Sequence, residues 1–398
     1  MRIPALVTVV TALTFGACTH APRATTTPKA ELGNVPSRDL DGAKPTAPPI
    51  PGDSHLVVKD PRITDLDIIK VHVAPKGPGS DEVETTTVAT ADLFREAGEA
   101  VKDRRTEAAI ALYRRIVSEF PESLYAPIAL FDIAAILDGR GDYPGTVATL
   151  RELVAKYPDA RESVEGHLYI AALQAEHQQY AEASTTLTAA LARTNLSYAD
   201  RVEAFARKGY VELEQKHLDA AEAALTSSVA EWTRAPRIED PYYIAMAGYY
   251  LGEVSHARFT AVAVRLPDDQ LLKDVEQKRV FAAQAYDRWR AALKHQQAYW
   301  ATASGYQMSQ IFVELWEATV KAPYPAHVTI AARPAYVTEV HERSREHLEK
   351  ALEGHRMNVE LAKAYGVETS WSKGSEVQAV RILNEIAKDS AGTYTTPE

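Results

Sequence analysis

The segment AIALYRRIVSEFP, residues 109–121, returns 37 residues later as TVATLRELVAKYP, residues 146–158. Each copy places a small residue, a Tyr or Leu and an apolar pair on one face of a helix, and each ends in an aromatic residue followed by proline. Because proline cannot continue a helix, both segments predict a helix that stops at Pro121 or Pro158. The shared period indicates a repeated structural unit and not one isolated helix.

Further copies of the unit lie on both sides of this pair. Slides of 37, 37 and then 38 residues align four successive units. In the first three, an aromatic residue or leucine is followed three residues later by a small residue. Small side chains let two helix axes approach closely, and bulky side chains fill the neighbouring groove. We predict that these positions pack one helix against the next: Phe94, Ala97, Ala108, Phe131, Ala134, Leu168, Ala171, Ala183, Gly209 and Ala221.

Each unit is expected to be a pair of helices joined by a short turn, such as Gly139–Tyr143 in the second unit. Stacked pairs form a solenoid whose concave face is lined by the first helix of each pair, and such faces bind peptides, helices or extended segments. The alternative is a plain helical bundle, and the fixed period argues against it. The first helices are expected at about residues 91–102, 126–138, 164–177 and 200–215.

This pattern resembles the tetratricopeptide-repeat (TPR) family over about residues 90–235, in the form found in bacterial envelope lipoproteins. The likeness rests on Phe-Pro-Glu-Ser and Lys-Tyr-Pro-Asp-Ala at the ends of the first two units, and on the family's small residues in both helices. Two features depart from the family. The second unit has Pro144-Gly145-Thr146 at its turn, and the third and fourth units lack the closing proline, with Asn195 standing in its place in the third. The resemblance implies an all-α, TPR-like superhelix.

Beyond Pro236 the period fades, but helical patterns persist. Residues 236–322 read as further divergent helix pairs with an insertion, and residues 323–398 as long helices with a tail. This half more distantly resembles the end regions of TPR lipoproteins linked to gliding motility. The aromatic residues in the half are expected to pack in the core: Tyr242, Tyr243, Tyr249, Tyr250, Trp289, Trp300, Tyr306 and Trp316. Helices are expected at residues 242–253, 274–294, 299–321, 337–364 and 373–388.

The N-terminus has the features of a leader. Residues 1–17 combine Arg2, a short apolar run and small residues before Cys18, which predicts a secretory signal peptide. Cys18 is the single cysteine, and the small residues before it resemble the lipobox of bacterial lipoproteins, which implies lipidation of Cys18. Phe15 stands where the box usually has Leu, and a secreted protein without lipid is the alternative. The sorting rule for such lipoproteins implies that Thr19 directs the protein to the outer membrane.

Residues 18–86 differ sharply from the rest of the chain. Ten of the 22 prolines lie in this part, and it contains no aromatic residue. Such a composition buries too little apolar surface to offset the entropy of ordering, so it predicts a disordered linker. One patch, at residues 63–73, comes close to the alternation of a strand, and it could dock on the helices or on a partner.

The sequence offers little for catalysis. No phosphate-binding loop or nucleophile elbow is present, and we expect no cofactor and no metal site. His341 and His347 are six residues apart, unlike the i, i+4 pair of a zinc site, and with His355 they are expected to lie solvated or half-buried on a polar stripe. The net charge of −10 argues against nucleic acid as a partner.

These features together predict a non-enzymatic interaction scaffold, lipid-anchored in the outer membrane and facing the periplasm. Its partners would be other envelope proteins, in outer-membrane assembly, motility or secretion machinery. The alternative is an envelope enzyme that acts on cell-wall glycan, with Glu314, Glu317 or Glu339 as acid–base candidates. Two facing carboxylates in the C-terminal half would favour the enzyme. The expected domains are residues 1–17, 18–86, 87–235, 236–322 and 323–398.

Overall fold

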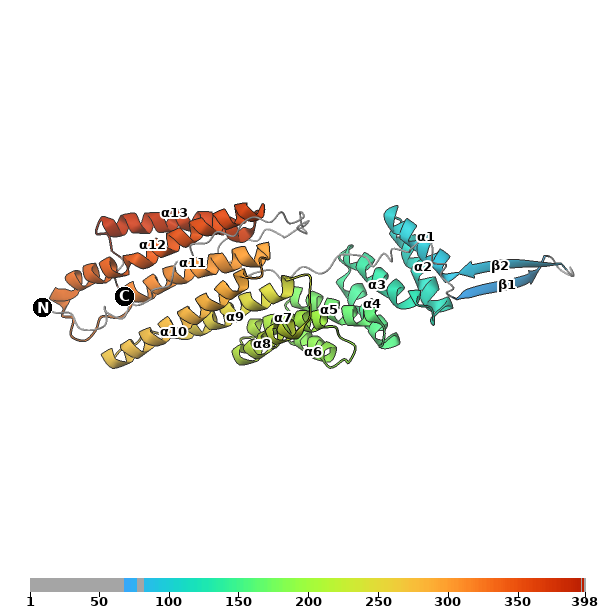
Figure 1. Cartoon of the computed structure of the whole chain (residues 1–398), viewed down its shortest axis with the longest axis horizontal. Helices are drawn as coiled ribbons and strands as arrows, with labels where there is room; N and C mark the ends of the chain where they lie inside the picture. Colours follow the sequence, from blue (N-terminus) through green and yellow to red (C-terminus); the bar gives the residue numbers. More distant parts are fainter. Residues whose placement is uncertain (1–67, 77–81, 395, 397–398) are drawn as a thin grey trace. The chain divides into compact units, whose positions relative to one another are not determined.

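The computed structural model describes residues 68–76, 82–394 and 396. These residues form two strands, thirteen α-helices and a short 3-10 helix η2, Ile330–Ala332 (Figure 1). The strands are β1 (Ile69–Pro75) and β2 (Val83–Ala89). The helices before residue 240 are α1 (Thr90–Lys102), α2 (Thr106–Glu119), α3 (Tyr125–Asp138), α4 (Tyr143–Lys156), α5 (Arg161–Glu176), α6 (Tyr180–Leu191), α7 (Tyr198–Glu214) and α8 (Leu218–Arg234). The later helices are α9 (Tyr242–Ala261), α10 (Asp268–Leu293), α11 (Ala298–Val320), α12 (Arg333–Tyr365) and α13 (Ser370–Ser390).

The chain forms two compact units that divide between Asp200 and Arg201. The described part of the first unit holds the two strands, α1 to α6 and the first residues of α7. The described part of the second unit holds the rest of α7 and the helices α8 to α13. Each unit is described by itself below.

The first unit opens with an antiparallel hairpin. Residues 69–75 pair with residues 83–89 in a register that sets Ile69 opposite Ala89, and Thr90 at the start of α1 donates both its N–H and its hydroxyl to the carbonyl of Ile68. Part of the linker prediction is therefore wrong, because residues 69–75 and 83–86 are strands. Backbone pairing with residues 83–89 stabilises a segment whose composition alone did not predict structure. The remainder of the predicted linker and the leader lie outside the described residues.

The helix pairs are present as predicted. The helices α1, α3, α5 and α7 correspond to the four predicted first helices, with ends that differ by at most three residues. Each is followed closely by a second helix, and neighbouring helices contact each other in chain order from α1 to α6. The chain is predominantly α-helical, and the predicted helix-pair architecture is confirmed.

The turn inside each pair repeats with the same period as the sequence. Arg104, Gly141, Gln178 and Lys216 follow the four first helices and have φ values of 58°, 73°, 60° and 66°. In every case the next residue donates its N–H to a carbonyl five positions back, as in Arg105 to Ala100. This arrangement closes the first helix with a left-handed residue. Only one of the four positions is glycine, so the turn is set by the helices on both sides of it more than by residue choice.

Small residues lie at the helix contacts of the repeats. Ala97, Ala134 and Ala171 are buried in α1, α3 and α5, and Phe131 and Leu168 are buried beside them, whereas Phe94 is half-buried. Gly209 in α7 lies against Leu225 of α8, where a Cβ would come within 2.3 Å of the leucine Cγ. The structure thus places small side chains where two helices approach most closely.

One predicted packing residue is wrong by a single position. Ala108 is exposed, and its neighbour Ala109 is buried, at the register also occupied by Thr146, Ala183 and Ala221. One residue turns a helix by about 100°, which is enough to move a side chain from a contact face to solvent. The same slide of 37 residues identifies Ala109 correctly.

The second unit is built from longer helices. Helices α9 to α13 have 20 to 33 residues each and pack in chain order, with further contacts of α11 to α9 and to α13 (Figure 1). All five helices were predicted, but α9 extends beyond residue 253 to Ala261 and α10 begins at Asp268, ahead of residue 274. Gln296, between α10 and α11, has a positive φ of 53°, like the turn residues of the earlier pairs. No described helix has the length and apolar character needed to cross a membrane.

Candidate binding surface

Helix α3, the first helix of the second pair, is more enclosed than the sequence indicates. Helix α3 contacts α1, α2, α4 and α5, and every one of its side chains is buried or half-buried. Its half-buried positions are mostly apolar and include Ile128, Ile136 and Leu137. A surface of this kind offers shallow apolar contacts between helices, and it suits an apolar helix or extended segment better than a charged peptide.

Polar contacts connect neighbouring repeats. The phenol of Tyr143 in α4 donates to the side-chain carbonyl of Gln179 at 2.6 Å, one repeat further along. In the same way, Arg114 of α2 pairs with Glu152 of α4 at 2.6 Å. Arg114 is 41% exposed, so this pair contributes little to the free energy of unfolding. Its role is to fix how one repeat is aligned on the next.

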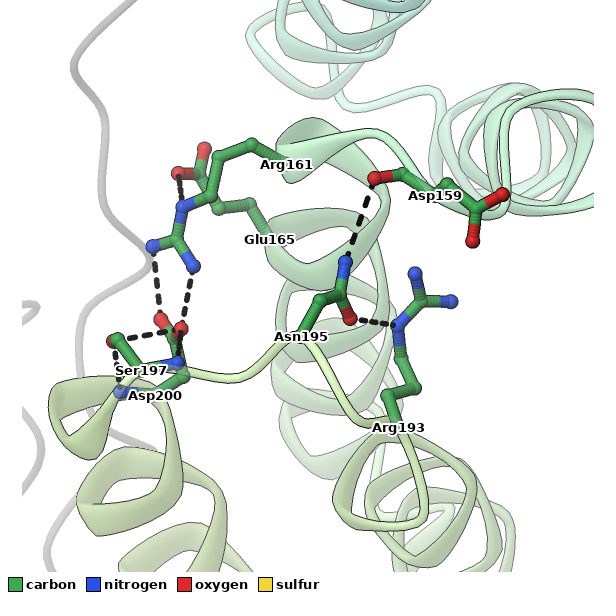
Figure 2. Close-up of polar contacts among 7 residues, drawn as sticks. All are labelled: Asp159, Arg161, Glu165, Arg193, Asn195, Ser197 and Asp200. Carbon is green, nitrogen blue, oxygen red and sulfur yellow. Dashed lines mark hydrogen bonds and ion pairs between the residues drawn. The ribbon is translucent and has the colours of Figure 1, made fainter.

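The junction between α6 and α7 has the most extensive of these contacts (Figure 2). Ser197 and Asp200 form a capping box, in which the hydroxyl of Ser197 accepts from the Asp200 N–H at 3.2 Å and the carboxylate accepts from the Ser197 N–H at 2.8 Å. Arg161, at the start of α5, donates to both oxygens of the same carboxylate and also pairs with Glu165 at 3.2 Å. Asp200 is therefore held from two helices.

The electrostatics of Asp200 follow from this geometry. Burial raises the pKa of the carboxyl, but the hydrogen bonds from Arg161 and Ser197 outweigh burial and bring the pKa below its ordinary value. The carboxylate is thus charged and fully occupied by donors of its own chain. A role in holding the helices together accounts for all of its contacts.

The same junction explains the missing proline. Asn195 stands where the first two helix pairs have Pro121 and Pro158. Its side-chain amide donates to the carbonyl of Asp159 at 3.5 Å (Figure 2). The guanidinium of Arg193 donates to the Asn195 side chain at 3.3 Å and also to the carbonyl of Pro158. The third helix pair therefore ends with side-chain hydrogen bonds to the loop between α4 and α5, whereas the first two pairs end with proline.

Each of the three acid–base candidates of the enzyme alternative bonds to a different residue. Glu317 pairs with Lys321 at 3.2 Å, and Glu339 pairs with Arg343 at 2.5 Å, both one turn away on their own helices. Pairs of this kind are ordinary features of a helix surface. Glu314 differs, because it bonds the imidazole of His256 in α9 at 2.6 Å.

Glu314 belongs to a cluster that the sequence did not reveal. Glu253 lies one turn before His256 on α9, and its carboxylate accepts from the side chain of Gln307 at 2.9 Å. Burial raises the pKa of Glu253 above its ordinary value. Burial lowers the pKa of His256, but the hydrogen bond and charge of Glu314 outweigh it and raise that pKa overall. The spacing of three between Glu253 and His256 on an apolar helix was the available sequence signal.

This cluster can hold a proton but does not form a metal site. A carboxyl with a raised pKa is a requirement for a general acid. Among the described residues, no group of three or more His, Cys, Asp or Glu side chains is arranged to hold a metal ion. The imidazole and Glu314 compensate each other, so the cluster is also explained as a polar contact between α9 and α11.

The three histidines of α12 are not on a solvated stripe, and that prediction is wrong. His341, His347 and His355 are 1%, 4% and 0% exposed, because α12 is covered by α11 on one side and α13 on the other. Burial lowers the pKa of His347 and of His355 to about 4. His341 bonds the carboxylate of Asp389 in α13. The pattern of polar and apolar residues along α12 could not show how much of its surface α11 and α13 would cover.

The aromatic residues of the second unit pack in its core, as predicted. Trp289, Trp300, Tyr249 and Tyr250 are at most 1% exposed. The ring of Trp300 packs against both tyrosines, with centroids 5.3 and 5.6 Å away. Trp316 is 5% exposed, and Tyr242, Tyr243 and Tyr306 are half-buried at the margin of this group. The four fully buried rings, Trp289, Trp300, Tyr249 and Tyr250, are therefore unavailable as interface anchors in this fold.

Comparison with known proteins agrees with the repeat geometry. Residues 80–237 match the family model described as a tetratricopeptide repeat-like domain. This part of the chain is a TPR-like domain. Domains of this class act as protein–protein interaction scaffolds. Helices α9 to α13 begin after the matched region. No curated protein matches the chain.

Several solved structures match the chain at low similarity. A monomeric mutant of IFIT1 with m7Gppp-AAAA is 13% identical and has a TM-score of 0.36, over 77% of this chain and 66% of that one. The human IFIT1 dimer with m7Gppp-AAAA is 13% identical and has a TM-score of 0.34, over 74% of this chain and 72% of that one. A tetratricopeptide repeat protein from Parabacteroides merdae is 12% identical and has a TM-score of 0.33, over 69% of this chain and 98% of that one.

Proposed function

We propose that this protein is a non-catalytic scaffold that is lipid-anchored at Cys18 in the outer membrane and faces the periplasm. The TPR-like domain of residues 80–237 supports the scaffold role, because stacked helix pairs of this kind bind peptides, helices or extended segments. The signal-peptide pattern and the single cysteine at position 18 support the anchor. The partners are other proteins of an envelope complex, in outer-membrane assembly, motility or secretion.

A lipid anchor and a binding domain reinforce each other physically. A single acyl chain gives only reversible attachment, whereas two or more chains hold a protein firmly on a membrane. Tethering confines the binding surface to a thin layer, which raises its effective concentration toward partners in the same membrane. Moderate contacts on an apolar helix surface are then sufficient for assembly.

Fractionation of cells that produce single-residue variants tests the anchor. We expect Cys18→Ala to move the protein from the membrane fraction to the soluble fraction. Thr19→Asp should keep it membrane-bound but shift it from the outer to the inner membrane, because the residue after the lipidated cysteine directs sorting. Thr19→Ser is the matched control and should remain in the outer membrane. An unchanged distribution of Cys18→Ala would overturn the lipoprotein assignment.

The scaffold role is tested by cross-linking in intact cells, followed by purification of the tagged protein and identification of its partners. Outer-membrane and periplasmic proteins should be captured by the wild type and depleted with Cys18→Ala. The enzyme alternative is carried by Glu253, Glu314 and His256. It predicts that the purified protein releases soluble fragments from cell-wall glycan and that Glu253→Gln stops this release. The scaffold proposal predicts no release by either protein.

A further inference from the structure

The first turns of α13 are held by buried polar contacts to α11 and α12. The hydroxyl of Thr369, the N-cap of α13, donates to the hydroxyl of Thr302 in α11 at 2.9 Å. The side-chain amide of Asn358 in α12 donates to the hydroxyl of Ser375 at 2.9 Å. The imidazole of His355 in α12 joins the same group, with Nδ1 3.2 Å from Ser375 Oγ. The charge of His355 therefore acts directly on the attachment of α13.

The site of His355 has no place for a second ring proton. His355 is fully enclosed, and its Nε2 has no hydrogen-bond partner within the described part of the chain. A neutral imidazole carries one N–H and a charged one carries two. In the charged form, Nδ1 can donate to Ser375, but the N–H of Nε2 is buried without an acceptor. Burial of a charge together with an unsatisfied donor is costly, so the attached helix favours the neutral imidazole.

No neighbouring charge offsets this cost. The groups that face His355 are the ring of Tyr306 in α11, with its centroid 5.2 Å away, and the hydroxyl of Ser375 in α13. Burial raises the pKa of Tyr306, so its phenol stays neutral. The charged residues nearest in sequence to His355 and Ser375 are exposed: Glu353, Arg356, Lys373 and Glu376. Among the described residues, none forms an ion pair with this imidazole.

The direction of the pH dependence follows from the two states of the helix. Burial lowers the pKa of His355 to about 4 while α13 is attached. A histidine in water has a pKa of about 6.5, and removal of α13 lets water reach the ring. The released state therefore binds more protons than the attached state between these two values. Release becomes more favourable as the pH falls through this window, and the attached state is favoured fully above it.

We propose that α13 is an acid-released helix and that protonation of His355 drives its release. The neutral imidazole permits attachment, whereas the charged imidazole is stable only where α13 has left. Release uncovers Trp371 and Ile382, which are 6% and 2% exposed in the attached helix. An apolar face of α13 that is closed at neutral pH thus opens in acid.

The other two buried histidines of α12 have different surroundings. His341 bonds the carboxylate of Asp389, which can balance a charge on the ring. His347 packs on the ring of Phe312 in α11, with centroids 6.3 Å apart, and it forms no hydrogen bond to α13 within the described residues. Its charged neighbours, Glu346 and Lys350, lie on α12 and pair with each other. His347 is therefore a matched control: a buried histidine of the same helix that does not bond α13.

Hydrogen exchange followed by mass spectrometry measures the release, because the protection factor of the α13 amides reports how often the helix opens. The purified wild-type protein is compared with His355→Gln, which cannot become charged. After correction for the intrinsic exchange rate, the protection factor should fall from pH 7 to pH 5 about twentyfold further in the wild type than in the variant. All other titrating groups are common to both proteins. An equal fall in the two proteins would overturn the proposal.

Two further variants separate release from general unfolding. His347→Gln should keep the pH dependence of the wild type in α13. Loss of that dependence would show that acid loosens the whole layer of helices, which contradicts release of α13 alone. Ser375→Asp places a carboxylate beside Nδ1 of His355, so the charged imidazole is paired while α13 is attached. Protection in this variant should no longer fall in acid, and a fall as large as that of the wild type would contradict the role of His355.

Discussion

The TPR-like helices α1 to α8 and the longer helices α9 to α13 pack by different means. In the repeats, small residues such as Ala97, Ala134 and Ala171 return at the same contact, and one turn geometry joins every pair. In the later helices, large rings such as Trp289 and Trp300 fill contacts that occur only once. A small residue fits any equivalent interface, whereas a ring needs a specific neighbour. The repeats also bury rings, among them Tyr113 and Phe120, so what sets them apart is the small residue that returns at the same contact.

The largest expected effect tests the ring-based packing of the second unit. Trp289 is fully buried, and its ring lies against Gly252 and the ring of His256. Trp289→Ala should lower the free energy of unfolding by about 3–5 kcal/mol, because it leaves a cavity between α9 and α10. Urea denaturation followed by circular dichroism measures this change.

Val280→Ala is the control for that substitution. It removes an apolar side chain that is 41% exposed on the same helix, and it should change the unfolding free energy by no more than about 0.5 kcal/mol. If Trp289→Ala lost no more than Val280→Ala, the contrast between the two regions would fail.

A smaller effect tests the close approach of the repeat helices. A Cβ on Gly209 would lie 2.3 Å from Leu225 Cγ, so Gly209→Ala should cost about 1–3 kcal/mol through overpacking. A Cβ on Gly98 of α1 would meet nothing within 4 Å, and Gly98→Ala should stabilise the fold by up to about 1 kcal/mol through helix propensity. Thermal unfolding should therefore move in opposite directions for the two variants. A shift of the same sign in both would argue against close packing at α7 and α8.

The smallest effect concerns the irregular junction at Asp200. Asp200→Asn should cost about 1 kcal/mol at neutral pH, because it weakens the capping box and removes the charge that Arg161 binds. The pKa of Asp200 is lowered in the folded state, so this contribution is full above the unfolded pKa of about 3.9 and is lost as pH falls through the lower folded pKa. The gap between wild type and variant in urea denaturation should thus be constant near neutrality and close in acid. A gap independent of pH would show that charge has no role at this junction.

The sequence predicted the helix pairs well because one physical rule, small against large at a fixed spacing, operates in each unit. The hairpin was anticipated only in part: residues 63–73 come close to the alternation of a strand, but the second strand was missed. That strand reads VETTTVA, and it has no run of alternating apolar residues. Its stability depends on pairing with residues 69–75 and on Lys70, which lies over the ring of Phe120 at 4.8 Å. Such contacts between distant residues are not visible in local composition.

The polar contacts were the least predictable part of the molecule. Arg161 and Asp200 are 39 residues apart and are ordinary charged residues in any local reading. Glu253 and His256 also gain their character from Gln307 and Glu314, which lie on another helix. The pKa and the bonding of such groups depend on the helices packed around them. The sequence of one helix does not show which other helices these are.

The left-handed turns at Arg104, Gly141, Gln178 and Lys216 have a consequence for how this protein could change in length. Because the chain has the same conformation at each of these points, a cut at one turn and another at the next leaves two ends that match. A segment of 37 residues, or of 38 between Gln178 and Lys216, could be lost or duplicated in the gene while the backbone at the new turn keeps its conformation. The number of helix pairs can therefore change by whole repeats.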